Sequence, residues 1–179
     1  MNSRPFLFVS LFLLVFAVAC NGQVRNGGND DTGPTGPGAN SFEITDIDGN
    51  DFSLDDHLGK DIIVLSVWST WCEPCKAEMP TLQKMHDTFG DKGLKILSVS
   101  LDGPETMSGV KPYVRSSGYT FTVAIDEDTS VAQSYNPRST LPFMVILNRD
   151  GSVHKKIEGF HLSEAESLVS EIKALVEAK

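Results

Sequence analysis

The chain has 179 residues, the length of one ordinary domain with some residues left over, and 40% of them are hydrophobic, which is enough to form a buried core. Its 24 acidic and 15 basic residues give a formal net charge of −9, and no long basic run is present, so the sequence argues against a nucleic-acid partner. Three cysteines are too few for a disulfide-rich scaffold or for a zinc site with four thiolate ligands.

The N-terminus has the layout of a secretory signal peptide. Arg4 precedes an apolar run over 5–19 that is too short to span a bilayer comfortably. Cys20 follows directly and resembles the lipidated cysteine of a bacterial lipobox, although Ala17 stands where that motif usually has leucine. We predict a signal peptide over 1–19 and an exported lipoprotein, anchored through a lipid on Cys20 in the periplasm or at the outer face of the cell membrane. An ordinary cleaved signal and an uncleaved anchor helix are the alternatives.

Residues 20–41 have the composition of a flexible tether. Gly, Asn, Pro and Thr dominate, and Val24 is the only aliphatic side chain larger than alanine. Such a segment cannot bury enough apolar surface to offset the entropy lost on ordering. We therefore expect a tether between the anchor and one folded domain over 42–179.

Strand-like patterns recur along this domain. Apolar runs or alternating patterns predict strands over 42–45, 51–54, 61–67, 94–101, 121–125, 143–147 and 152–158. The continuous apolar runs at 61–67 and 94–101 are typical of strands buried on both faces. Turn residues at 48–50 and 148–151 predict an N-terminal β-hairpin and a second hairpin near the C-terminus.

Helical patterns alternate with these strands. Apolar side chains at helical spacing predict helices over 75–89, 105–117, 129–135 and 163–178. Pro112 is expected to kink or split the second helix, and Ser163 with Glu166 has the spacing of a capping box for the last. The order of elements predicts an α/β fold with a central mixed β-sheet flanked by helices.

The chemistry is concentrated at Trp71-Cys72-Glu73-Pro74-Cys75, between a predicted strand and a predicted helix. Cys72 would lie at the helix N-terminus, where unpaired N–H groups and the helix dipole stabilise a thiolate, the nucleophile of disulfide exchange. Cys75, one turn further, is expected to be more buried and to resolve a mixed disulfide by attacking Cys72. Pro74 is tolerated in the first helical turn because its missing N–H would have been unpaired.

Two alternatives compete with a redox-active pair. A zinc or copper site needs ligands beyond two cysteines, and the nearest histidine, His86, follows Cys75 by eleven residues. A purely structural disulfide is disfavoured because a bond between Cys72 and Cys75 closes a very short loop, which adds little to stability. We expect no cofactor other than a Cys72–Cys75 disulfide, and no metal.

The segment VLSVWSTWCEPCKAEMPTLQKM, residues 64–85, resembles the active-site strand and helix of the thioredoxin fold. Its continuation over 76–80 is similar to membrane-attached thiol-disulfide oxidoreductases of the TlpA and ResA type, in the AhpC/TSA–redoxin superfamily. The resemblance covers most of 42–179 and implies a thioredoxin-like fold. It also implies that Pro142 is a cis-proline facing the two cysteines, which leaves the backbone of Leu141 free to pair with an extended client.

The resemblance further implies roles for residues around the cysteines. Trp71, expected to shield the disulfide at the surface, would contact clients together with Glu73 and Pro74. Glu78 matches the acidic residue that ResA-like proteins place near their cysteines, whereas Ser66 stands where thioredoxin has a buried carboxylate. We hypothesise that Glu78 is partly buried, has a raised pKa and handles the proton of the resolving cysteine. The alternative is a solvated residue favoured only by the helix dipole.

Three functions remain open at this stage. The leading one is a monomeric, exported reductase of disulfide-bearing client proteins, supplied with electrons by a membrane thiol transporter, with cytochrome c maturation as one client pathway implied by resemblance. The second is a thiol-dependent peroxidase on the same fold, although Leu65 and Ser69 replace the Pro and Thr that usually precede a peroxidatic cysteine. The third is a non-enzymatic module that binds copper or zinc.

Overall fold

The computed structural model describes Met1 and residues 40–178. The predicted signal peptide, Cys20 and nearly all of the predicted tether lie outside the described residues and stay predictions. Asn40 and Ser41, the last residues of the predicted tether, already contact the domain: the Tyr135 hydroxyl donates to the Asn40 carbonyl over 2.8 Å, and the Ser41 hydroxyl donates to Asp55 over 2.7 Å.

The described strands form two sheets. A hairpin of β1 (Glu43–Thr45) and β2 (Asp51–Ser53) makes a two-stranded antiparallel sheet. The main sheet has five strands in the order β5-β4-β3-β6-β7. Its members are β3 (Ile62–Trp68), β4 (Leu94–Ser100), β5 (Thr122–Ile125), β6 (Phe143–Leu147) and β7 (Val153–Glu158). Strands β3, β4 and β5 are parallel to one another, while β6 and β7 add as antiparallel neighbours, so the sheet is mixed as the sequence predicted.

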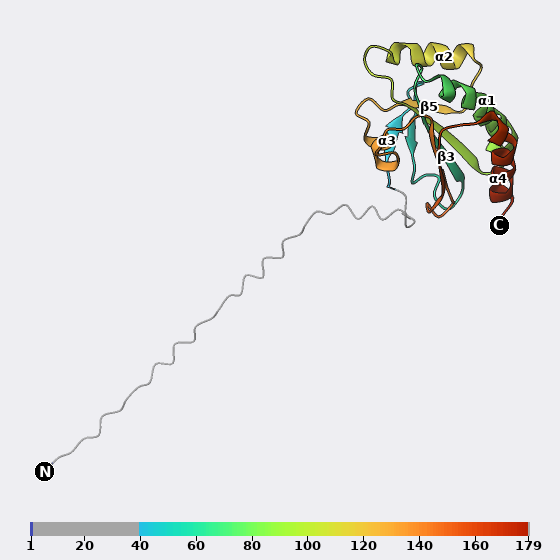
Figure 1. Ribbon diagram of the computed structural model, residues 1–179. Coiled ribbons are helices and arrows are strands. Elements are labelled where there is room, and N and C mark those ends of the chain that lie inside the picture. The colour runs from blue at the N-terminus through green and yellow to red at the C-terminus, as the bar shows by residue number, and fades with distance from the viewer. Residues whose placement is uncertain (2–39, 179) are drawn as a thin grey trace. The chain divides into compact units, whose positions relative to one another are not determined.

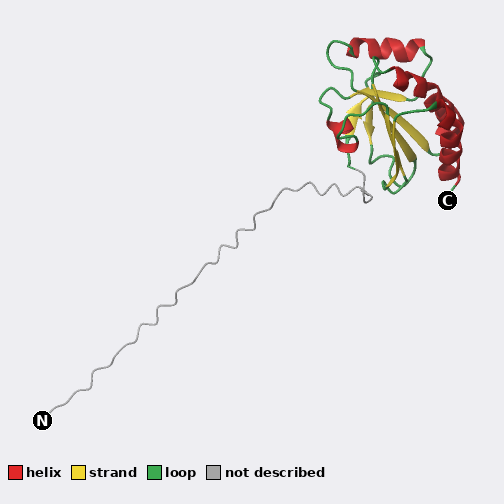
Figure 2. Ribbon diagram, viewed as in Figure 1, coloured by secondary structure: helices red, strands yellow, loops and turns green. Residues whose placement is uncertain are grey.

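Helices cover both faces of the main sheet (Figures 1 and 2). They are α1 (Glu73–Phe89), α2 (Val110–Ser116), α3 (Ser130–Tyr135) and α4 (Ala165–Glu177). Buried side chains of α1, α2 and α4 form one apolar core with the sheet, and α3 and the β1–β2 hairpin form another on the opposite face. The predicted α/β architecture with an N-terminal β-hairpin is confirmed. None of the helices in this part of the chain is long and apolar enough to cross a membrane.

Two local predictions need correction. Pro112 does not kink a long helix: residues 107–109 form a 3₁₀ turn, α2 begins only at Val110, and Pro112 lies in its first turn, where a missing N–H costs nothing. The capping box is also wrong. The chain enters the last helix through a 3₁₀ turn over Leu162–Glu164, so Glu164 rather than Ser163 occupies the cap position, and it makes no capping bond through its side chain.

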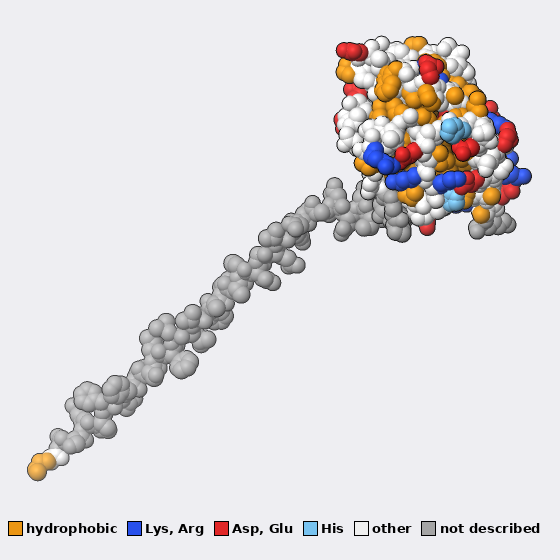
Figure 3. All heavy atoms as spheres, in the orientation of Figure 1, with side chains coloured by type: hydrophobic (Ala, Val, Ile, Leu, Met, Phe, Trp, Pro, Cys, Tyr) orange, Lys and Arg blue, Asp and Glu red, His pale blue; other side chains and the backbone are white. Residues whose placement is uncertain are grey.

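Figure 3 shows a face on which acidic and basic side chains lie side by side. One group joins strand β7 to helix α4: Lys155 Nζ lies 2.8 Å from Glu171, and the His154 ring nitrogen Nε2 lies 3.0 Å from the same carboxylate. Because these charges are paired locally, the surface of the β7 edge is mixed in sign and is protected against pairing with another strand.

Arg149 connects the turn between β6 and β7 to the end of α4. Its guanidinium donates to the carbonyls of Leu175, Val176 and Ala178 over 2.9 to 3.2 Å, and Nε donates to the Lys60 carbonyl over 3.2 Å. The last carbonyls of a helix have no partner within it, so the guanidinium satisfies three of them at once.

Arg149→Ala should lower the free energy of unfolding by about 1–3 kcal/mol, because hydrogen bonds from a charged donor are lost at four carbonyls. Urea unfolding followed by circular dichroism measures it. The matched control is Lys173→Ala on the same helix, whose exposed contact with Glu177 spans 3.9 Å; its effect should stay within about 0.5 kcal/mol. Equal effects of the two variants would contradict the capping role.

Candidate active site

The site is built where the central strand β3 passes into helix α1. After Trp68 the chain makes a tight turn in which the Cys72 N–H donates to the Ser69 carbonyl over 3.1 Å. Cys72 is the N-cap residue of α1, and Pro74 lies in the first turn. The predicted helix therefore begins at Glu73, and Cys72 sits at its N-terminus as the sequence predicted.

Cys72 and Cys75 are joined by a disulfide. The Cys75 N–H donates to the Cys72 sulfur over 3.3 Å, so a free N–H group of the first helical turn points at that atom. Cys72 is 7% exposed and Cys75 is 1% exposed. Cys72 is thus the sulfur that a partner reaches more easily, and the helix dipole favours negative charge on it.

The two tryptophans lie in opposite environments. Trp68 is 1% exposed and its ring contacts Tyr113, whereas Trp71 is 61% exposed directly beside Cys72. The exposed position of Trp71 agrees with the expectation that it lies at the surface beside the disulfide. Glu73 is exposed and forms an ion pair with Lys76 over 2.8 Å, so its charge is partly balanced beside the disulfide.

Glu78 is buried between α1 and the main sheet. It is 2% exposed, and the Ser66 hydroxyl donates to its carboxylate over 2.9 Å. Burial raises the pKa of Glu78 from 4.5 to about 7, and the hydrogen bond from Ser66 opposes this shift. The alternative of a solvated first-turn residue is therefore wrong, because the helix turns this side chain toward the sheet.

Pro142 directly precedes strand β6 at the edge of the site. The Leu141–Pro142 peptide bond is cis, and Phe143 pairs with Val67 near the end of β3. This register brings the proline to the edge of the sheet that carries the disulfide. Asn136 fixes the preceding loop, because its amide exchanges hydrogen bonds of 2.8 and 3.2 Å with the Thr140 backbone.

The histidine and methionines that follow the cysteines in α1 make packing contacts. His86 packs edge-on against Phe121 with ring centroids 6.4 Å apart, and Met79 and Met85 are buried in the core. Among the described residues, no three His, Cys, Asp or Glu side chains come together in a way that would hold a metal ion.

Sequence reasoning missed Asp102. This residue follows strand β4, is 1% exposed, and accepts hydrogen bonds from both the N–H and the hydroxyl of Thr70, two residues before Cys72. The available signal was its position: polar residues after parallel strands gather at the same edge of a sheet. Ser66 was noted only for the carboxylate it replaces, and not as the partner of Glu78.

A mixed sheet that holds a two-cysteine disulfide at the start of a helix, opposite a cis-proline, defines a class of protein, the thiol-disulfide oxidoreductases of thioredoxin-like fold. Comparison with known proteins makes the assignment more specific. Residues 35–156 match the AhpC/TSA family.

The thiol-disulfide oxidoreductase ResA of a Bacillus cereus strain is 32% identical over 166 residues, which cover 92% of this chain and 94% of that relative. ResA of Bacillus subtilis (strain 168) is 32% identical over 141 residues, or 79% of this chain and 75% of that relative. The crystal structure of StoA from Bacillus subtilis superposes with a TM-score of 0.62 at 25% identity, covering 73% of this chain and 95% of that one. This chain belongs to the AhpC/TSA family and, within it, to the TlpA/ResA-like thiol-disulfide oxidoreductases.

The raised pKa of Glu78 makes stability depend on pH. The folded protein binds this proton more tightly than the unfolded chain, so the contribution is complete below about pH 4.5 and is lost as the pH rises through about 7. The free energy of unfolding of the wild type should fall by about 2–3 kcal/mol between about pH 5 and about pH 9 because of this group, and Glu78→Gln should abolish that fall.

Urea unfolding of the oxidised protein across this pH range measures the difference between wild type and variant. Glu127→Gln, at an exposed position, is the control and should keep the wild-type profile. A Glu78→Gln profile parallel to that of the wild type would show that Glu78 is not protonated preferentially in the folded state.

Proposed function

We propose that this protein is an exported reductant that breaks disulfides in client proteins outside the cytoplasm. The observation that carries the proposal is the unequal pair at the start of α1: Cys72 is the more exposed sulfur and accepts a helix N–H, while Cys75 is buried behind it. One sulfur is placed to attack a partner and the other to complete the exchange.

The reduced protein would act in two steps. The Cys72 thiolate attacks one sulfur of the client disulfide, which forms a mixed disulfide and releases the other client sulfur as a thiolate that takes up a proton. Cys75 then loses its proton and attacks the Cys72 sulfur, which releases the second client thiol. Two electrons pass from the cysteine pair to the client, and the protein is left with the Cys72–Cys75 disulfide.

Glu78 is the group that would receive the Cys75 proton. It lies one helical turn beyond Cys75, it is buried, and its pKa of about 7 is suited to exchanging a proton near neutral pH. The hydroxyl of Ser66 orients the carboxylate from strand β3. Ser66 itself is not a base at this pH, so the proton pathway runs through the helix rather than through the strand.

The client would bind across the exposed side of the disulfide. Leu141 is half-buried and makes no backbone hydrogen bond to any other residue in 40–178, so its N–H and carbonyl are available to an extended client segment. Trp71, Glu73 and Pro74 are chain neighbours of Cys72, and Pro142 directly precedes the strand that pairs with β3, so these four residues would complete the contact.

The cysteine pair needs an electron supply after each cycle. A membrane thiol transporter is the partner that fits a protein anchored outside the cytoplasm through Cys20, and cytochrome c maturation is one pathway that would use such a reductant. The predicted signal at 1–19 and the resemblance to the ResA relatives support this location. We propose that the protein works there as a monomer.

Insulin reduction tests the activity directly. The reduced full chain should reduce insulin in a single turnover, Cys72→Ser should not react, and Cys75→Ser should accumulate a mixed disulfide that non-reducing mass spectrometry detects. Glu78→Gln should form the mixed disulfide normally but resolve it about tenfold or more slowly near pH 7, because a general base typically contributes about 10²–10⁴-fold. Rapid consumption of hydrogen peroxide with no reaction toward insulin would favour the peroxidase instead.

The direction of electron flow follows from the reduction potential of the Cys72–Cys75 couple. Equilibration of the full chain with glutathione or dithiothreitol buffers should give a value near the roughly −270 mV of thioredoxin or lower. A potential near the roughly −120 mV of strong periplasmic oxidants would make the protein a disulfide donor and would overturn the proposal.

A further inference from the structure

Asp102 holds the turn that presents Cys72. Its carboxylate accepts the Thr70 N–H over 2.8 Å, the Thr70 hydroxyl over 2.5 Å and the Ser100 hydroxyl over 2.7 Å. Thr70 is the second residue of the four-residue turn that the Cys72 N–H closes on the Ser69 carbonyl. A buried carboxylate just after strand β4 therefore fixes the backbone of the turn after the neighbouring strand β3, two residues before the reactive Cys72.

The same residue begins the loop that faces Trp71. The chain after Asp102 turns back at once, and the N–H groups of Thr106 and Met107 donate to the Gly103 carbonyl over 2.9 and 2.8 Å. Between this loop and the Trp71 ring lies an open groove of about 390 Å³, lined by Trp71, Gly103, Pro104, Glu105 and Thr106. Asp102 is thus connected to both walls of the groove. Its hydrogen bonds to Thr70 link it to the wall that carries Trp71, and the peptide chain links it to the wall formed by residues 103–106.

The groove continues the surface around the disulfide, because Trp71 is bonded directly to Cys72. A client segment that brings its own sulfur to Cys72 is extended and advances about 3.3 Å per residue, so a side chain one or two residues from the attacked cysteine reaches the groove. The indole of Trp71 and the ring of Pro104 offer that side chain an apolar contact. The single carboxylate of the lining, Glu105, disfavours an acidic one.

From this geometry we infer that Asp102 is a positioning residue for client recognition: it holds the Ser69–Cys72 turn against the Gly103–Thr106 loop, and so keeps open the groove that takes an apolar side chain next to the attacked cysteine of the client. The inference rests on the proposed reduction of client disulfides. It assigns Asp102 to the binding of protein clients and not to the exchange reaction itself.

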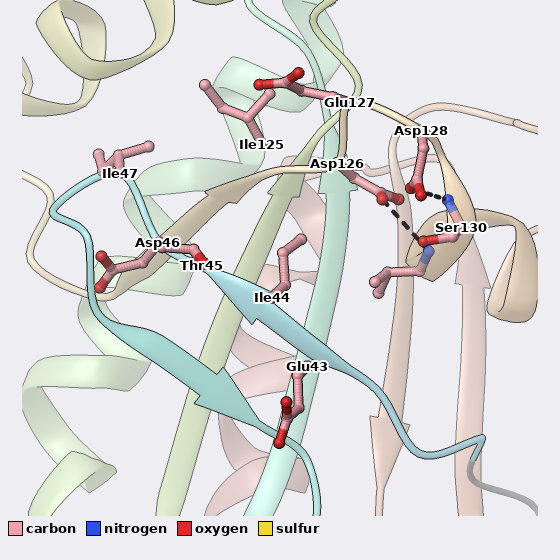
Figure 4. Close-up of a pocket in the computed structure, with 11 residues that line it drawn as sticks. Glu43, Ile44, Thr45, Asp46, Ile47, Ile125, Asp126, Glu127, Asp128 and Ser130 are labelled. Atoms are coloured by element: carbon pink, nitrogen blue, oxygen red, sulfur yellow. Dashed lines mark hydrogen bonds between the residues drawn. The ribbon is translucent and has the colours of Figure 1, made fainter.

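The chain contains a matched control in Asp126. It follows the adjacent strand β5 as Asp102 follows β4, it is 4% exposed, and it accepts the backbone N–H groups of Val131 and Ala132 over 3.4 and 2.7 Å. Figure 4 shows it at a different hollow, where β5 and the start of α3 meet strand β1. Asp126→Asn removes the same charge from an equally buried carboxylate that holds α3 instead of Thr70.

The experiment compares two disulfides in single turnovers of the reduced full chain. Insulin provides a protein segment with side chains on both sides of the attacked sulfur, whereas 2-hydroxyethyl disulfide has neither a peptide segment nor an apolar side chain to place in the groove. The variants are Asp102→Asn and Thr70→Val, which remove the link from either side, with Thr70→Ser as the conservative variant and Asp126→Asn as the control. Thermal unfolding identifies any variant that does not fold.

Asp102→Asn and Thr70→Val should raise the half-saturating concentration of insulin about tenfold, because a buried hydrogen bond to a charged group is lost. The limiting rate with insulin and the reaction with 2-hydroxyethyl disulfide should each change less than about twofold. Thr70→Ser and Asp126→Asn should behave as wild type.

Equal losses toward both disulfides would place Asp102 in the reactivity of Cys72 and overturn the inference, as would unchanged half-saturation in both variants. Should Asp102→Asn fail to fold, Thr70→Val decides by the same criteria. A wild-type protein that reacts with the small disulfide but not with insulin would instead contradict the proposed function.

Discussion

The junction between strand β3 and helix α1 determines where the chemistry of this protein takes place. The strand is buried on both faces at the centre of the main sheet, so its end is fixed in space, and the helix that follows directs its free N–H groups at Cys72. The other parts of the site are arranged around this junction. Strand β6 pairs with β3 and brings cis-Pro142 to it, and strand β4 pairs on the other side and brings Asp102.

Buried carboxylates with different roles lie behind this junction. Glu78 faces an apolar core with one hydroxyl as its partner, so burial prevails and raises its pKa to about 7. At Asp102 burial also acts to raise the pKa, but the hydrogen bonds donated by Thr70 and Ser100 outweigh it and keep the pKa below the ordinary value. Deeper desolvation with a single donor at Glu78, against weaker desolvation with several donors at Asp102, therefore separates a group that can exchange a proton near neutral pH from a group that stays charged and holds the backbone.

Glu78 and Asp102 also lie at different places relative to the two cysteines. Glu78 lies one helical turn beyond Cys75 in α1 and both residues are buried, so the proton transfer that we propose would take place away from solvent. Asp102 holds the turn that leads to Cys72 and begins the loop that faces the exposed Trp71, where we propose that a client binds. The two cysteines therefore differ in access: Cys75 is almost completely covered, whereas Cys72 keeps a small accessible surface.

The sequence alone predicted the order of strands and helices, both hairpins and the reactive Cys72–Cys75 pair, because periodicity, turn residues and helix starts are local properties of the chain. The resemblance to a known family added the fold and the cis-proline. Burial of Glu78 was a hypothesis with a solvated alternative, and only the packing of α1 against Ser66 decided between them. The strand order, the bond between Asp102 and Thr70 thirty-two residues away, and the Arg149 contacts with α4 were decided by tertiary structure. Such contacts join residues that are distant in the chain, and their partners are set by how the sheet and helices pack, which no local pattern records. The incorrect capping box at Ser163 has the same origin, since the path by which the chain enters α4 follows from its packing and not from the motif.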